Sequence, residues 1–279
     1  MKRVLITGNS GYIGSHLSHL LKQDPNLELY GLDKDEPIVK LSTFCLHDIT
    51  DTKPLLYQTE QAEFDCVVHL ASTVNVPRSF ESPSLYFETI VNGTKNILQN
   101  IKFDHFIYAS SGSAEAMISP YGIAKRMAEI LVEDWCRKNN KEFSLLRFYN
   151  VTGTSTIKIR EDTILNKLIQ ARAEGFFNIY GADYDTIDGT PIKDYTHVLE
   201  VVDAINKIIY TPANNIEHFG HCSPLTVKQV IDIFKHVNSC DFEVRIEPRR
   251  IGDVGSNVAM FPSRYLPKVY STQELFRVW

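Results

Sequence analysis

The feature that most constrains the fold is a glycine-punctuated turn at the start of the chain. Residues 3–7 (RVLIT) predict a short buried strand that runs directly into glycines at positions 8, 11 and 14, and an amphipathic stretch over about 12–23 predicts a helix after them. A strand, a tight turn and a helix in this order bring backbone N–H groups and the positive end of the helix close to a bound pyrophosphate. The spacing G-x-x-G-x-x-G departs from the common G-x-G-x-x-G, so three ordinary turn glycines are the alternative explanation.

An acidic residue at the end of the next strand supports a dinucleotide site. The run LELYGL at 27–32 predicts a second strand, and Asp33 follows it, 19 residues after Gly14. A carboxylate in this place accepts hydrogen bonds from both ribose hydroxyls of an adenosine and repels a 2′-phosphate, which favours NAD over NADP. A solvated loop carboxylate is the alternative for Asp33. The predicted dinucleotide-binding residues of this region are Gly8, Gly11, Tyr12, Ile13, Gly14 and Asp33.

The first half of the chain alternates short apolar runs with longer helical patterns. Further strands are expected at 65–70, 105–110 and 143–148, and helices between them at 83–101 and 121–139. This alternation is typical of a parallel sheet that is covered by helices on both faces. We therefore expect an α/β protein in which residues 1–153 form an NAD-binding, Rossmann-type, doubly wound parallel sheet.

After residue 153 the pattern changes. Helices are expected at 162–174, 198–210 and 226–238, a turn-rich stretch at 181–193, and loops in the proline-containing tail. We expect residues 154–279 to form a smaller α/β substrate-binding lobe, with residues 194–211 packing back on the first domain.

A tyrosine and a lysine one helical turn apart are the candidate catalytic pair. Tyr121 and Lys125 open a predicted helix and share one face of it. The pKa of a free phenol is near 10, and a nearby ammonium or oxidised nicotinamide lowers it by stabilising the phenolate. Ser111 ends the preceding strand, where open parallel sheets bind ligands, and can relay a hydrogen bond between a substrate hydroxyl and Tyr121. Tyr30 and Lys34 have the same spacing at a strand end, so the spacing alone is weak evidence.

Together these motifs resemble the extended short-chain dehydrogenase/reductase superfamily. The matching residues are Thr7-Gly8, Gly11, Gly14, Asp33, Asp48-Ile49, His69-Leu70-Ala71, Asn92-Gly93-Thr94, Ser110-Ser111, and Tyr121 with Lys125. Within that superfamily the second half of the chain is most similar to UDP-glucose (UDP-galactose) 4-epimerases, through Ile179 to Val198 and through Pro248 to Asp253. The resemblance covers nearly the whole chain and implies an NAD-dependent isomerase.

The resemblance also implies roles for individual residues. Asp48 and Ile49 would border the adenine, Leu70, Ala71 and Ser72 would line the dinucleotide, and Asn92, Tyr121 and Lys125 would complete the cofactor site. The implied substrate-binding set is Ser111, Tyr121, Asn150, Lys193, Arg250 and Asp253. Asn150 would approach the UDP diphosphate, Arg250 would hold it and Asp253 would bind the uridine ribose, roles that suit an arginine fork and a carboxylate.

Several residues depart from the family pattern. The link from Ser111 to Tyr121 is markedly shorter than in the family, with Ala114-Glu115-Ala116 in place of the usual Val-Tyr-Gly. Lys193 stands where these epimerases usually carry an arginine, which keeps the charge and loses the bidentate fork.

Composition narrows the range of partners and compartments. The formal net charge of −5 gives no general attraction to nucleic acid or anionic membranes. Five scattered cysteines, without a C-x-x-C pair, favour a cytoplasmic protein over a disulfide framework or a metal site. No apolar run approaches 18 residues, so no membrane span is expected. A homodimer is expected by analogy, through the helices at 83–101 and 121–139, although their apolar residues Ile90, Ile97, Ile130 and Leu131 are of a kind more often found in cores.

The leading functional hypothesis is NAD-dependent epimerisation at C4 of a UDP-hexose of the glucose/galactose type, through a 4-keto intermediate. Tyr121 would remove the proton of the 4-hydroxyl, with Ser111 as relay, while the fixed UDP anchors the substrate. One alternative is a nucleotide-sugar 4,6-dehydratase, but Gly112 and Ser113 occupy the places of its acid and base, and Glu115 comes late. The other is a non-catalytic protein that binds NAD or a sugar nucleotide, which has no need for a low-pKa phenol.

Overall fold

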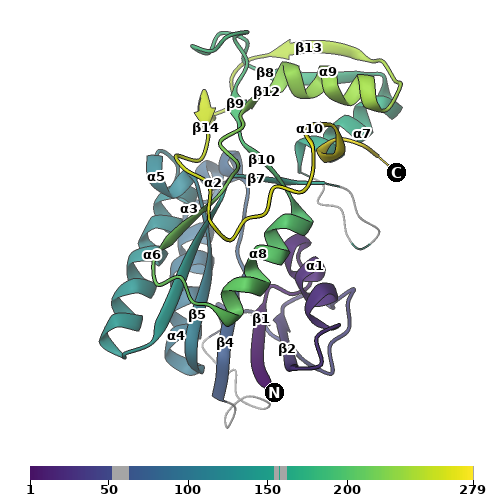
Figure 1. Ribbon diagram of the computed structural model, residues 1–279. Helices are drawn as coiled ribbons and strands as arrows, with labels where there is room; N and C mark the ends of the chain where they lie inside the picture. Colours follow the sequence, from purple (N-terminus) through teal and green to yellow (C-terminus); the bar gives the residue numbers. More distant parts are fainter. Residues whose placement is uncertain (52–62, 154–156, 158–161, 279) are drawn as a thin grey trace.

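A parallel sheet of seven strands forms the centre of the protein. The computed structural model describes residues 1–51, 63–153, 157 and 162–278 (Figure 1). The strands lie in the order β11-β6-β5-β4-β1-β2-β3, and every neighbouring pair is parallel. Their bounds are β1 Lys2–Thr7, β2 Leu27–Asp33, β3 Thr43–Leu46, β4 Glu63–His69, β5 Lys102–Ser111, β6 Glu142–Phe148 and β11 Ile216–Phe219. The strand order reverses between β1 and β4, which places the ligand crevice of a doubly wound fold at their carboxyl ends.

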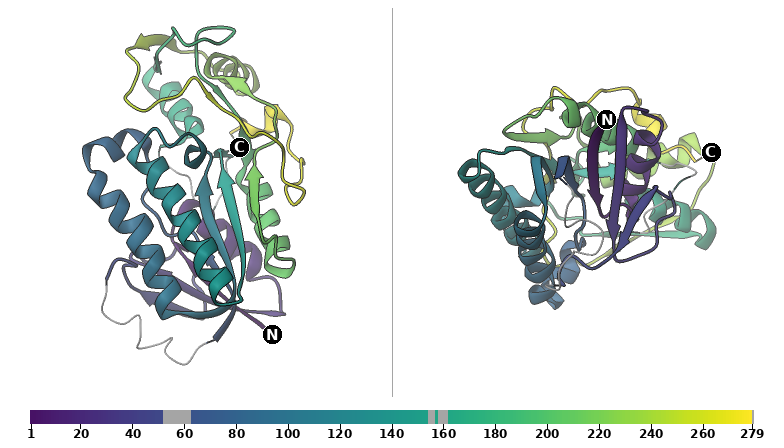
Figure 2. Two further views of the ribbon diagram at one scale, coloured as in Figure 1. Left: turned by 90° about the vertical axis from the view of Figure 1, so that its left-hand side faces the viewer. Right: turned by 90° about the horizontal axis from the view of Figure 1, so that it is seen from below.

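Helices cover both faces of this sheet. One face carries α1 (Tyr12–Leu21) and α8 (Val198–Tyr210), which lie side by side. The other face carries α2 (Val76–Glu81), α3 (Pro83–Phe87), the π-helical segment η1 (Glu88–Asn92), α4 (Gly93–Asn100) and α6 (Pro120–Lys138). Figure 2 shows the two helical layers with the sheet between them.

Side chains of each central strand alternate between the two faces, which explains why both layers are held by apolar contacts. Leu5 of β1 joins the cluster under α4 and α6, whereas Val4 and Ile6 join the cluster under α1 and α8. Val67 and Val68 of β4 divide in the same way. Because successive residues of a strand point to opposite faces, a strand covered on both sides must be apolar throughout.

A third hydrophobic cluster lies in the second half of the chain. It packs α7 (Ile164–Glu174) and α9 (Val227–Val237) against the small parallel sheet of β8 (Phe176–Tyr180) and β13 (Glu243–Glu247). Shorter elements connect this part to the main sheet: β7 (Asn150–Thr152), β9 (Ile192–Lys193), β10 (Tyr195–His197), β12 (Leu225–Thr226), β14 (Ser256–Asn257) and α10 (Thr272–Leu275). The short helix α5 (Ser113–Ala116) follows β5.

Most expected elements are present, and the differences have local causes. The single helix expected over 83–101 is interrupted by η1, and this π-helical segment leaves both Ile90 and Ile97 in the core. The sequence did not predict β11, because the central two of its four residues are Glu217 and His218 and the run therefore shows no apolar pattern. Both side chains are nevertheless buried in the structure. The tail, expected as loops, contains β13, β14 and α10. Residue 154, the first of the expected second lobe, lies outside the described residues.

A buried histidine in the sheet makes the stability of the fold depend on pH. His105 of β5 is 2% exposed, its Nε2 lies 3.0 Å from Ser144 Oγ and its Nδ1 lies 3.6 Å from Cys66 Sγ. Burial lowers the pKa of this imidazole to about 3. The folded protein therefore keeps His105 neutral at a pH where the unfolded chain, with a histidine pKa near 6.5, takes up a proton.

We predict that His105→Gln flattens the acid dependence of stability. The contribution of the neutral ring is fully present above pH 6.5 and is lost as the pH falls from 6.5 toward 3. Between pH 7.5 and pH 5.0 the wild type should lose about 2 kcal/mol more of its free energy of unfolding than the variant does. Urea titrations at the two pH values measure the free energy of unfolding of each protein. An equal loss of this free energy in wild type and variant would contradict the prediction.

Candidate active site

The glycine turn after β1 is shaped by close backbone contacts. A Cβ added to Gly14 would overlap the carbonyl oxygen of Gly8, and one added to Gly8, whose φ is +74°, would lie 2.5 Å from the backbone nitrogen of Ala71. The Leu70 N–H donates to the Thr7 carbonyl at 3.0 Å, which ties the turn to the end of β4. The backbone here is therefore bare and open to close approach by a ligand.

Asp33 lies at the edge of this turn. Its Oδ2 accepts the backbone N–H of Ser10 at 2.8 Å, and its Oδ1 accepts the N–H of Asp35 at 3.1 Å. Helix α1 begins directly after Gly11, which has no side chain to cap the first turn. A carboxylate beside an uncapped helix start has the donor and acceptor set that an adenosine diphosphate requires, so these residues fit a dinucleotide.

The other predicted cofactor residues lie around the carboxyl ends of the neighbouring strands. Leu70, Ala71 and Ser72 follow β4 directly, beside Gly8. Ile49 is buried and packs on Gly93, whereas the Asp48 carboxylate is exposed and accepts the N–H and the hydroxyl of Thr50. Tyr12 is buried and its hydroxyl donates to the Gly153 carbonyl, so its backbone and not its ring faces the turn. Asn92 is exposed on η1 and its amide donates to Glu88 at 2.6 Å, so its side chain is engaged with its own helix.

The catalytic candidates meet where β5 ends and α6 begins. Ser119 caps α6 by accepting the Gly122 N–H at 3.1 Å, and Pro120 occupies the first helical position, a typical helix start. Tyr121 is therefore in the first turn of the helix, and its side chain is only 9% exposed. Ser111, the last residue of β5, lines the same pocket as Tyr121. The Ser111 hydroxyl accepts the Ser113 N–H at 3.2 Å.

Lys125 lies beneath this pair. Its ammonium donates to the Ala109 carbonyl at 2.6 Å and lies 5.0 Å from the ring centre of Tyr108 and 6.0 Å from that of Tyr121. Burial lowers the pKa of Lys125 to about 7, against an opposing effect of the Glu129 carboxylate. The lysine is thus fixed to the strand and held against two phenol rings.

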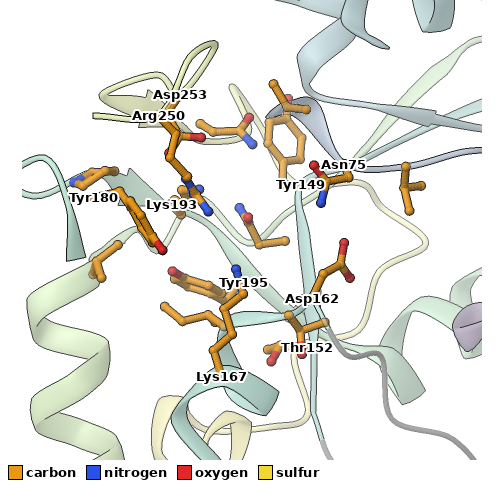
Figure 3. A pocket seen from close by; sticks show the side chains of 18 of the residues that line it. Asn75, Tyr149, Thr152, Asp162, Lys167, Tyr180, Lys193, Tyr195, Arg250 and Asp253 are labelled. Carbon is orange, nitrogen blue, oxygen red and sulfur yellow. The ribbon is translucent and has the colours of Figure 1, made fainter. Parts of the chain in front are cut away.

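One cleft of about 290 Å³ joins the catalytic candidates to the second half of the chain. All six residues predicted to contact substrate line it: Ser111, Tyr121, Asn150, Lys193, Arg250 and Asp253. Ser111 comes from β5 and Tyr121 from α6, whereas Lys193 comes from β9. Arg250 and Asp253 come from the loop after β13. Figure 3 shows Arg250 and Lys193 directed into the cleft from the same wall.

The cationic end of the cleft is only partly neutralised. Arg250 donates through Nε to Asp253 Oδ2 at 2.8 Å, and the two side chains form an ion pair of 2.7 Å through Nη2. The guanidinium lies 4.6 Å from the ring centre of Tyr180. Burial lowers the pKa of Lys193, and Asp253 opposes this shift. Lys167 of α7, which the sequence analysis did not single out, also lines the cleft; its only signal was its place beside the apolar residues of an amphipathic helix.

The shortened segment between Ser111 and Tyr121 holds a charge network that the sequence did not reveal. Glu115 of α5 accepts Arg147 Nη1 at 2.9 Å and the Tyr149 hydroxyl at 3.1 Å. Arg147 also donates from Nε and Nη2 to both oxygens of the buried Glu129 at 2.8 Å. Ser110 donates to Glu129 at 2.6 Å, so the network reaches the end of β5. Tyr149 lines the cleft and packs on Gly112.

The described part of the chain contains neither a membrane span nor a group of metal-ligating side chains. None of its helices is both long and apolar enough to span a bilayer. Nor do its histidine, cysteine, aspartate and glutamate side chains gather in a group of three or more that could hold a metal ion.

We predict that Lys125 makes the protein more stable as the pH rises above 7. A lowered lysine pKa means that the folded protein binds fewer protons than the unfolded chain between pH 7 and pH 10.5, so the free energy of unfolding increases across that window. From pH 7 to pH 9, wild type freed of dinucleotide should gain about 2 kcal/mol relative to Lys125→Met. Urea unfolding at each pH measures this, and identical pH slopes would show that burial does not shift Lys125.

Comparisons with known proteins agree with this geometry. Residues 4–219 match the family described as the NAD dependent epimerase/dehydratase family. UDP-glucose 4-epimerase of Lactobacillus helveticus is 28% identical over 294 residues, which cover 92% of this chain and 88% of that protein. UDP-arabinose 4-epimerase 1 of Arabidopsis thaliana is 28% identical, over 90% of this chain and 70% of that protein. The crystal structure of Bifidobacterium longum UDP-glucose 4-epimerase with NAD+ and UDP has a TM-score of 0.88 at 21% identity, over 99% of this chain and 96% of that one.

The family match covers most of the chain, and it confirms the expectations of an extended short-chain dehydrogenase/reductase, of a Rossmann-type fold and of NAD as the cofactor. The chain belongs to the NAD dependent epimerase/dehydratase family.

Proposed function

We propose that this protein is an NAD-dependent 4-epimerase of UDP-sugars, and that its substrate is a UDP-hexose of the glucose/galactose type. The observation that carries the proposal is the single cleft that has Ser111 and Tyr121 at one end and Lys193, Arg250 and Asp253 at the other. A sugar nucleotide has the same division, since a reactive neutral sugar is joined to an anionic diphosphate. Relatives named for epimerases of UDP-glucose and UDP-arabinose support the reaction at C4.

Each residue has a chemical task in this reaction. Lys193 and Arg250 bind the diphosphate, so the nucleotide stays in place while the sugar turns. Tyr121, beside the Lys125 ammonium, takes the proton of the 4-hydroxyl, and Ser111 passes a hydrogen bond between that hydroxyl and the phenol. Bound at the turn after β1, NAD supplies the transient oxidation at C4 that allows the configuration to invert. Once the keto sugar has turned its other face toward the cofactor site, Tyr121 returns the proton to the oxygen at C4, so acid and base are the same residue.

The two alternative functions receive no support from the site. A 4,6-dehydratase needs a free acid after the serines, but the Glu115 carboxylate is engaged with Arg147 and Tyr149. A protein that only binds the nucleotide has no need for a phenol of lowered pKa, whereas here the Tyr121 ring lies 6.0 Å from the Lys125 ammonium in the cleft.

We predict that the wild type converts UDP-galactose to UDP-glucose and that Tyr121→Phe lowers kcat by about 10²- to 10⁴-fold. UDP should bind the variant within about twofold of wild type, because the anion-binding end is unchanged. Tyr210→Phe is the matched control, since Tyr210 does not line the cleft. Its phenol is exposed and donates a hydrogen bond to Asp24. Chromatography of the products with UDP-galactose, UDP-N-acetylglucosamine and UDP-arabinose tests the sugar. Turnover of another sugar without UDP-galactose would reject the hexose assignment, and full activity of Tyr121→Phe would reject the mechanism.

We propose in addition that a second copy of this chain docks on α3 and α6. Ile123, Met127 and Ile130 follow one another at helical spacing on the outer face of α6 and are 38%, 45% and 53% exposed, and Leu85 of α3 is 54% exposed. Ile90 and Ile97, in contrast, belong to the core. An apolar stripe on adjacent helices is typical of a symmetric helical interface between identical subunits. The cytoplasmic location of the protein stays a prediction.

We predict that Ile130→Lys converts a dimer into a monomer, because it places a charge at the most exposed residue of the apolar stripe on α6. Ile246→Lys, at a 58% exposed site on β13, is the control and should leave the mass unchanged. Sedimentation equilibrium gives the mass of each protein. A wild type that sediments as a monomer at every concentration would contradict the proposal.

A further inference from the structure

We propose that Lys167 is a third cationic ligand of the substrate diphosphate, together with Lys193 and Arg250. The inference rests on the proposed function and adds to it a binding residue from α7. Figure 3 shows the Lys167 side chain directed into the cleft from the side opposite Lys193 and Arg250.

The local structure fixes the direction of Lys167. Thr163 caps α7 by accepting the Asn166 N–H at 3.3 Å. Leu165 and Leu168, on either side of Lys167, are 2% and 0% exposed and anchor the helix in the third hydrophobic cluster. With these two side chains fixed in the core, the stem of Lys167 lies along the cleft wall and its ammonium reaches the space in front of Tyr195.

Positive charge exceeds negative charge among the described side chains of the cleft, which favours the binding of an anion. Among the described residues that line the cleft are three cationic side chains, Lys167, Lys193 and Arg250, and two carboxylates, Asp162 and Asp253, so these five side chains together carry a net charge of +1. Asp253 is engaged with Arg250 through both Nε and Nη2. Among the described residues, no carboxylate lies within ion-pair distance of Lys167 or Lys193.

The lowered pKa values of the two lysines agree with a position that binds an anion. Burial lowers the pKa of Lys167, and the nearby Arg250 lowers it further, while Asp162 and Asp253 oppose the shift. Burial also lowers the pKa of Lys193, and both Arg250 and Lys167 contribute in the same direction. Like charges that are held together away from water raise the free energy of the free protein, and a bound dianion removes that cost.

Among the parts of a UDP-sugar, the diphosphate matches this cluster. Uridine and a hexose are neutral, and neither needs three cations. A carboxylate on the sugar has the same chemistry as one phosphate oxygen pair, so it is the competing explanation for Lys167. Arg250 acts electrostatically on Lys167, and both of them act on Lys193, so the three cations lie close enough together to share one diphosphate.

The test is a set of calorimetric titrations with UDP, uridine and UDP-glucuronate at low ionic strength. Loss of one charged hydrogen bond corresponds to an affinity about ten- to a hundredfold weaker, so Lys167→Gln should weaken UDP binding by that factor. Uridine should bind within about twofold of wild type, and Lys167→Arg should restore most of the UDP affinity. Arg172→Gln removes a positive charge from the exposed face of the same helix and should change nothing.

The outcomes separate this inference from the proposed function. If the wild type binds UDP and Lys167→Gln binds it equally well, Lys167 is not a ligand of the diphosphate and the proposed function stands. If Lys167→Gln binds only UDP-glucuronate more weakly than wild type does, the lysine binds a carboxylate on the sugar and the inference is wrong. If Lys167→Gln loses uridine and UDP in the same proportion, the residue supports the fold and does not bind phosphate. If the wild type does not bind UDP, the proposed function fails and the inference fails with it.

Discussion

The hydrogen bond from the Lys125 ammonium to the Ala109 carbonyl is the interaction on which the site depends. It joins the first turns of α6 to the last residues of β5, and these two segments carry Tyr121 and Ser111. Lys125 is only 3% exposed, so water cannot replace the Ala109 carbonyl as acceptor for its ammonium. Loss of this hydrogen bond would therefore leave a buried charge without a partner. The same bond therefore holds helix and strand together where Tyr121 and Ser111 meet, which makes the geometry of the candidate site part of the fold.

At the other end of the cleft, the fold brings together segments that are far apart in the chain. Lys167, Lys193 and Arg250 stand on α7, on β9 and in the loop after β13. The hydrophobic cluster of α7, α9 and β8, the strand with which β13 pairs, fixes the framework that carries them. Rigid apolar packing behind a charged surface keeps like charges close in the absence of a ligand. In the function proposed above, a substrate that spans the cleft is held by these cations while its sugar faces Tyr121, as a reaction that reverses the face presented to the cofactor requires.

The sequence predicted the parts of this protein that depend on local pattern. The glycine turn, the apolar strands β1, β4, β5 and β6, and the start of α6 at Ser119-Pro120 follow from periodicity and capping, which the chain encodes within a few residues. β11 and Lys167 do not, because the first is a short strand with buried polar residues and the second is a lysine whose meaning depends on Lys193 and Arg250. Burial and neighbouring charge arise only from tertiary packing, and no local signal reports them.

The short segment after Ser111 shows how a departure from the family pattern can leave the site intact. The Glu115 carboxylate, in place of an aromatic residue of the family pattern, lies at the surface beside the cleft, and its side chain is 31% exposed. Here the carboxylate accepts Arg147 and the Tyr149 hydroxyl, and Tyr149 fills the space above Gly112, where any Cβ would meet its ring at 2.6 Å. Glu115, Tyr149 and Gly112 therefore form one mutually dependent set. The shortened segment therefore changes the side chains beside the cleft while Ser111 and Tyr121 still line it together with Tyr149.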